Sequence, residues 1–132
     1  MSQHAAVEIL LVEDDPQDLE LTLRALRKAN LTNHIHTARD GAEALEILSR
    51  DQGAFDLLLT DIQMPVMDGI ALALTAARDF PDLTILLMTG FADQRERAPG
   101  LNAIAHDVVT KPFSVADIRT AVADALAAGR KG

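Results

Sequence analysis

Five short apolar runs recur along the chain, and each is followed by a longer segment in which apolar residues return at helical spacing. The runs are predicted strands, and they cover residues 8–12, 34–37, 57–60, 84–88 and 107–110. Strands that alternate with helices form a mostly parallel sheet with helices packed on its faces. The alternation therefore predicts an α/β fold.

In the third run three leucines precede Thr60 without interruption by a polar residue. A strand that is apolar at consecutive positions is covered on both faces, whereas a half-exposed strand alternates apolar and polar residues. We therefore expect this strand to lie centrally in the sheet. Asp61 would then emerge at its carboxyl end.

Capping residues predict where the helices begin. Pro16 suits the first turn of a helix that carries leucines on one face, and Asp40 is a cap for the next helix. A further helix is expected near residues 70–78. Ser114 and Asp117 form a capping arrangement for the last helix, because they stand three residues apart.

Length, composition and charge limit the possible functions. A chain of 132 residues fits one domain, which we expect to span residues 1–132 with a core at about 7–128. The net charge of −8 repels nucleic acid and anionic lipid, and no apolar run reaches the roughly 18 residues of a membrane span. There is no cysteine, and no secretory signal is recognisable. We expect a cytoplasmic protein without direct nucleic-acid or membrane binding.

The predicted strand ends carry the chemistry. The first strand delivers Glu13 and Asp14, the third Asp61, the fourth Thr89 and the fifth Lys111. Parallel strands bring their carboxyl ends to one edge, where ligands bind. Three carboxylates that meet there repel one another unless a cation neutralises them or one of them takes up a proton. An all-oxygen donor set favours Mg²⁺, and Lys111 would balance the remaining charge.

The same residues are what phosphoryl transfer to a carboxylate requires. Asp61 is the best nucleophile, because it alone follows a strand with no polar residue before Thr60, and the loop residues that flank it leave it accessible. Thr89 and Lys111 would bind the phosphate oxygens.

The metal would be held by residues from two strand ends and one loop. Asp14 would bind it directly, and Glu13 directly or through water. The carboxylate of Asp61 and the backbone carbonyl of Gln63 would complete the set.

Four blocks of the sequence resemble the signature blocks of response regulator receiver domains, in the same order and at the family's spacing. They are Val12-Glu13-Asp14-Asp15-Pro16, Asp61-Ile62-Gln63-Met64-Pro65 followed by Asp68-Gly69, Met88-Thr89-Gly90, and Lys111-Pro112-Phe113. The resemblance covers nearly the whole chain. It implies a flavodoxin-like (βα)₅ fold, a doubly wound parallel sheet of strand order 2-1-3-4-5.

The resemblance also implies a function. A stand-alone CheY-like receiver would accept a phosphoryl group on Asp61 from a histidine kinase or a histidine phosphotransfer protein, and small acyl phosphates would substitute. It would be no enzyme beyond its own phosphorylation and dephosphorylation. Its signal would pass to a downstream protein, and the face of the fourth helix, fifth strand and fifth helix would serve for partners or a homodimer.

Three features of the chain bear on how such a switch would work. Receiver domains usually carry an aromatic residue three positions before the lysine, and Val108 stands there. A helix is expected between residues 92 and 106, but Pro99-Gly100 would end or kink it. We also expect Phe91 to shield the acyl phosphate from water.

Three other functions compete. Haloacid-dehalogenase-type phosphatases use a similar set but need an aspartate two residues after the nucleophile, where this chain has Gln63. A flavin-binding module would need a Ser/Thr/Gly-rich phosphate loop after the first strand and an aromatic residue to stack on the ring, and we find neither in this sequence. A degenerate receiver that serves only as a protein-binding adaptor is disfavoured by the intact acidic set.

Overall fold

The computed structural model describes residues 8–29, 34–51, 54–62, 69–90, 105–111 and 113–130. It contains one sheet of five parallel strands in the order β2-β1-β3-β4-β5, which confirms the predicted order. The strands are β1 (Glu8–Val12), β2 (His34–Ala38), β3 (Leu57–Asp61), β4 (Thr84–Thr89) and β5 (Asp107–Thr110). The described helices are α1 (Pro16–Lys28), α2 (Gly41–Arg50), α3 (Gly69–Asp79) and α6 (Val115–Arg130).

The central position predicted for the third strand is confirmed. β3 pairs with β1 on one side and with β4 on the other. Its three leucines have no exposed surface, because successive side chains point to opposite faces and each face is covered. Asp61 is the last residue of the strand.

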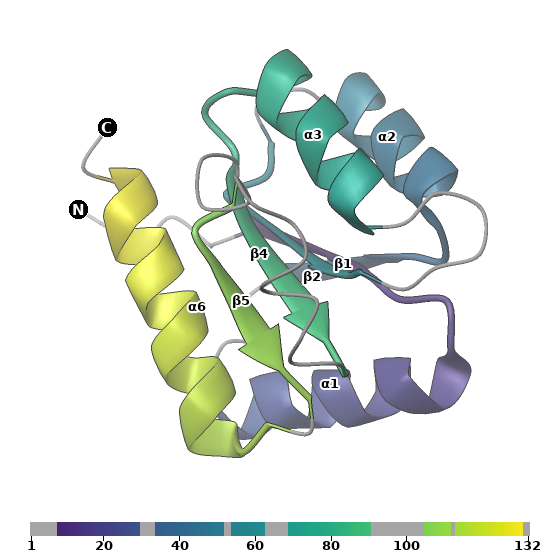
Figure 1. Ribbon diagram of the computed structural model, residues 1–132. Coiled ribbons are helices and arrows are strands. Elements are labelled where there is room, and N and C mark those ends of the chain that lie inside the picture. Colours follow the sequence, from purple (N-terminus) through teal and green to yellow (C-terminus); the bar gives the residue numbers. More distant parts are fainter. Residues whose placement is uncertain are drawn as a thin grey trace.

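Helices cover the sheet on both faces, and the core therefore has two halves. Figure 1 shows α1 and α6 on one face and α2 and α3 on the other. The first half of the core is centred on Leu11, Leu59, Leu86, Ile118 and Val122, which pack with one another and with α1 residues. The second half contains the side chains that point the opposite way from the same strands, packed with residues of α2 and α3.

The helix starts are capped as the sequence predicts. The carboxylate of Asp40 accepts a hydrogen bond from the amide of Glu43 at 2.8 Å. Pro16 begins α1 directly after the cap residue Asp15. The Ser114 hydroxyl accepts from the Asp117 amide at 3.0 Å, while the Asp117 carboxylate accepts from the Ser114 amide at 3.1 Å. These reciprocal bonds satisfy amides that would otherwise have no partner at a helix start.

Element bounds differ from the expected ones by one residue at several ends. β2 continues to Ala38 and β4 to Thr89, and α3 covers Gly69–Asp79. Of the helix expected between 92 and 106, only residues 105 and 106 are described, and they are not helical; Pro99-Gly100 lies outside the described residues.

Candidate functional site at the carboxyl edge of the sheet

Four of the predicted site residues meet at one edge of the sheet. Glu13 follows β1, Asp61 ends β3, Thr89 ends β4 and Lys111 follows β5. Backbone hydrogen bonds hold these strand ends in place. The amide of Lys111 donates to the carbonyl of Thr89 at 2.6 Å, and the amide of Glu13 donates to the carbonyl of Ala38 at 3.0 Å. The sheet therefore fixes the relative positions of the four residues through the main chain.

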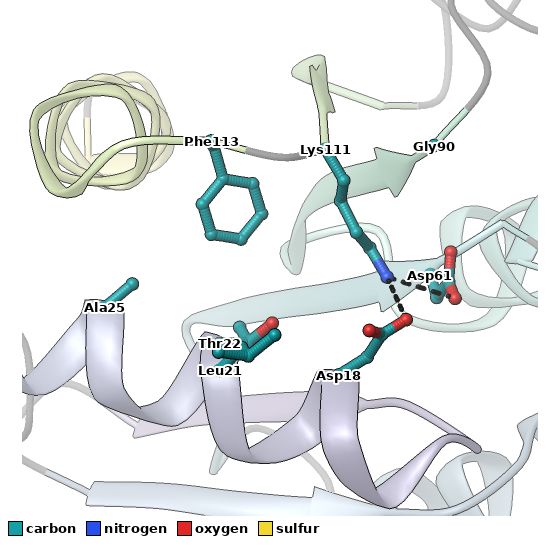
Figure 2. Close-up of a pocket in the computed structure, with 8 residues that line it drawn as sticks. All are labelled: Asp18, Leu21, Thr22, Ala25, Asp61, Gly90, Lys111 and Phe113. Carbon is teal, nitrogen blue, oxygen red and sulfur yellow. Dashed lines mark hydrogen bonds and ion pairs between the residues drawn. The ribbon is translucent and has the colours of Figure 1, made fainter.

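The ammonium group of Lys111 lies at the centre of the site. Its Nζ donates to Glu13 Oε1 at 2.9 Å, to Asp18 Oδ2 at 3.3 Å and to Asp61 Oδ2 at 3.4 Å. Figure 2 shows the Lys111 side chain extending from the end of β5 to a point between Asp18 and Asp61. One cation thus pairs with three carboxylates from β1, α1 and β3.

The side chains of the site are largely buried, and burial shifts the pKa values of their charged groups. Glu13 is 1% exposed, Asp61 6% and Thr89 0%. Burial raises the pKa of Glu13 to about 7, and the charge of Asp61 adds to the rise, although the hydrogen bond from Lys111 opposes it. Burial alone would lower the pKa of Lys111, but the hydrogen bond to Glu13 and the charges of Asp61, Glu13 and Asp18 outweigh it, so that this pKa is raised. The lysine stays charged while Glu13 can gain a proton.

Glu13 should therefore make stability depend on pH when Mg²⁺ is absent. Because its pKa lies above the ordinary 4.5 only in the folded chain, the stability that it contributes is full below pH 4.5 and is lost as the pH rises through about 7. Glu13→Gln removes this titration. Between pH 5 and pH 8 in EDTA, the free energy of unfolding of the unaltered chain should therefore fall by about 1 to 3 kcal/mol more than that of the variant. Urea unfolding curves at several pH values measure this, and parallel pH profiles would contradict it.

The acidic side chains could hold a hard cation. Carboxylate oxygens of Glu13, Asp18 and Asp61 all lie within 4.8 Å of one another. An all-oxygen set of this kind suits Mg²⁺. Asp14, which the sequence predicts as a metal ligand, is exposed and is not a member of this group. The carbonyl of Gln63 lies outside the described residues, so both remain predictions.

Asp18 was not identified from the sequence. It lies in the first turn of α1, and its position relative to the site depends on how that helix packs on the sheet. A weak signal exists, because Asp18, Thr22 and Ala25 follow the i, i+4, i+7 spacing of one helix face, and Thr22 and Ala25 are buried. Leucines dominate the pattern of this helix and hide that stripe.

A groove leads to Asp61 along α1. Its volume is about 500 Å³, and one of its lining residues, Leu21, is 62% exposed. Figure 2 shows α1 along one side and Phe113 on the other, with Lys111 and the carboxylates at one end. The lining residues are Asp18, Leu21, Thr22, Ala25, Asp61, Gly90, Lys111 and Phe113. Asp61 is thus buried, yet reachable from this groove.

Two of the residues that the sequence connects with the switch, Val108 and Phe91, differ in what the structure describes of them. Val108 is 7% exposed and belongs to the core half beneath α2 and α3, so an apolar side chain replaces a ring at this position. Phe91 lies outside the described residues, and its shielding role stays a prediction.

A second polar cluster lies at the opposite edge of the sheet. The two oxygens of the Glu8 carboxylate contact Nδ1 of His34 and Nε2 of His36. The hydrogen bond to His34, followed by that to His36, lowers the pKa of Glu8. This cluster ties β1 to the edge strand β2 and is remote from the site of Lys111.

The fold and this edge are those of the doubly wound α/β class, which binds ligands at the carboxyl ends of its strands. The chain belongs to the response regulator receiver domain family, whose model matches residues 9–123. Members of this family are phosphorylation-based modules of two-component systems, and they bind Mg²⁺ in an acidic pocket and interact with histidine kinases and downstream targets.

Individual relatives agree with this assignment. CpdR of Brucella abortus is 42% identical over 115 residues, which cover 83% of this chain and 88% of that protein. MprA of Mycobacterium ulcerans is 35% identical over 113 residues, which cover 86% of this chain but 47% of that regulator. The crystal structure of TrrA from Thermotoga maritima in complex with Mg²⁺ and BeF is 28% identical, with a TM-score of 0.79 and coverage of 90% and 98%.

None of the helices in the described parts of the chain combines the length and apolarity needed to cross a bilayer.

Proposed function

We propose that the chain is a single-domain response regulator that accepts a phosphoryl group on Asp61 and signals by altered protein binding. The observation that carries the proposal is the pairing of Lys111 Nζ with both Asp61 and Glu13, at 3.4 Å and 2.9 Å. These residues come from three different strand ends, yet one ammonium reaches both carboxylates. That is the arrangement that a carboxylate nucleophile and its charge-neutralising partner require.

The phosphoryl donor is a histidine kinase or a histidine phosphotransfer protein. A carboxylate oxygen of Asp61 attacks phosphorus, the P–O bond forms as the donor's P–N bond breaks, and the electron pair stays on the imidazole nitrogen. Lys111 and the hydroxyl of Thr89 then bind oxygens of the transferred group, since Lys111 can exchange its bond to Asp61 for one to phosphate. The groove beside Asp61 is the route along which the donor's imidazole approaches.

Mg²⁺, when bound, neutralises the charge that carboxylates and phosphoryl oxygens share. Glu13 and Asp61 would hold it, with Asp14 and the carbonyl of Gln63 as the remaining predicted ligands. Support comes from the relative TrrA, whose structure contains Mg²⁺ and BeF.

The output follows from charge. A phosphoryl group on Asp61 adds negative charge beside Thr89 and Lys111, and this shifts the population of nearby conformations. The changed surface binds a kinase, another regulator or a target protein. The cytoplasmic location, the homodimer and the lack of any reaction beyond the chain's own phosphorylation and dephosphorylation remain predictions.

Removing the metal tests the proposal. With acetyl phosphate and Mg²⁺, the intact mass of the chain should increase by one phosphoryl group. With excess EDTA, the rate of adduct formation should fall by at least about 100-fold, because the negative charges of donor and site then face each other without a cation. Time courses of intact mass give both rates. Adduct formation at the same rate in EDTA would contradict the proposal, as would steady turnover of a generic phosphomonoester.

A further inference from the structure

Asp18 adds a carboxylate to the site from a direction that the strand ends do not provide. It projects from the first turn of α1, and its Oδ2 lies 3.3 Å from Lys111 Nζ. Its side chain is 41% exposed, whereas that of Glu13 is 0% exposed. Both carboxylates contact the same ammonium, but only Asp18 faces solvent.

The difference in exposure between Asp18 and Glu13 corresponds to their positions relative to the groove. Asp18, Asp61 and Lys111 line it together, while Glu13 is not among its lining residues. A donor that reaches Asp61 through the groove therefore arrives beside the charge of Asp18, whose carboxylate oxygen lies within 4.8 Å of one of Asp61 (Figure 2). Small phosphodonors are anions, and a carboxylate a few ångströms from their path repels them. Asp18 also occupies one donor position of Lys111, the group that would otherwise attract the incoming phosphate.

We propose that Asp18 is a specificity-determining residue for phosphoryl transfer, which disfavours small anionic phosphodonors at the end of the groove where Asp61 lies. The inference rests on the proposed function, since it concerns access to Asp61 as phosphoacceptor. A protein donor brings its own neighbouring side chains and is not repelled as a bare dianion is. The chain would thereby respond to its protein donor more than to free acyl phosphates.

Two small donors of different charge test the proposal. Acetyl phosphate is a dianion at neutral pH, whereas phosphoramidate carries less net negative charge because its nitrogen is protonated. With Mg²⁺ saturating, Asp18→Asn should speed adduct formation from acetyl phosphate by about three- to ten-fold, and that from phosphoramidate by less than half of this factor. The ratio between donors is measured on one variant, so that a loss of stability affects both rates alike.

Two further variants separate charge from structure. Asp18→Glu keeps the charge and should restore the donor ratio of the unaltered chain. Glu20→Gln makes the matched change on the solvent side of α1, where Glu20 pairs with Arg24 at 3.5 Å, and should leave the ratio unchanged. The effect of Asp18→Asn should shrink in about 0.5 M salt, where the Debye length is only about 4 Å.

The outcomes are distinct. A donor ratio that Asp18→Asn leaves unchanged overturns the inference, and so does slower transfer from both donors with a greater need for Mg²⁺, which would make Asp18 a metal ligand instead. If neither donor phosphorylates the unaltered chain or Asp18→Asn, the proposed function fails and this inference fails with it. If all variants are phosphorylated at one rate, only the inference fails.

Discussion

A chain with Asp61→Asn should take up no phosphoryl group from acetyl phosphate and Mg²⁺, under conditions in which the unaltered chain is phosphorylated. The amide has nearly the same shape as the carboxylate but lacks the charged oxygen that attacks phosphorus. The variant should still fold, because Lys111 keeps Glu13 at 2.9 Å and Asp18 at 3.3 Å as partners. Intact-mass measurement therefore reports loss of the acceptor and not loss of the fold.

The matched control is Asp82→Asn, the same change at an exposed residue just before β4, at the opposite edge of the sheet. It should be phosphorylated at the rate of the unaltered chain. An adduct of equal amount on Asp61→Asn would assign the phosphoryl group to another side chain, which peptide mapping would then identify.

Gly69→Ala should destabilise the chain by about 3 kcal/mol or more, because the new methyl group has no room. A Cβ at this position would lie 2.2 Å from the carbonyl oxygen of Asp61 and 2.7 Å from the Cα of Ile62. Both atoms belong to the main chain at the end of β3, so neither can rotate away. The amide of Gly69 also donates to the carbonyl of Ile62 at 2.7 Å, and this bond holds the start of α3 against the strand end.

The same clash should reach the site, since the main chain of Asp61 must shift. We expect the phosphorylation rate of Gly69→Ala to fall even at temperatures where the variant is folded. Gly90→Ala is the control for stability, because a Cβ there meets no atom of the described residues within 4 Å, and it should change the free energy of unfolding by less than about 0.5 kcal/mol. Urea unfolding of both variants measures the contrast, and equal stabilities would contradict it.

The fold could be predicted because its signals are local and agree with one another. Three consecutive leucines at 57–59 mark β3 as central, and caps such as Asp40 and Ser114 mark helix starts within a few residues. The order of the strands needed the family resemblance, because periodicity does not state which strands pair. Ends such as Ala38 and Thr89 were missed by one residue, since the last hydrogen bond of a strand depends on its neighbour.

The site could be predicted only in part, because only some of its residues are placed by local sequence signals. Glu13, Asp61, Thr89 and Lys111 follow strands, so a parallel sheet brings them together. Asp18 lies on a helix, and its contact with Lys111 depends on a packing angle that no local pattern encodes. For Asp14 the sequence could not distinguish two adjacent acids, of which the structure buries Glu13 and exposes the other.

The two halves of the core, which the sheet keeps apart, have a consequence for evolution. Among the described residues, the buried side chains beneath α1 and α6 form one cluster and those beneath α2 and α3 form another. New partners can thus be acquired by altering α2 and α3, while α1 and the strand ends keep the acidic edge in place. The same fold can therefore change its binding partners and keep the residues of its acidic edge.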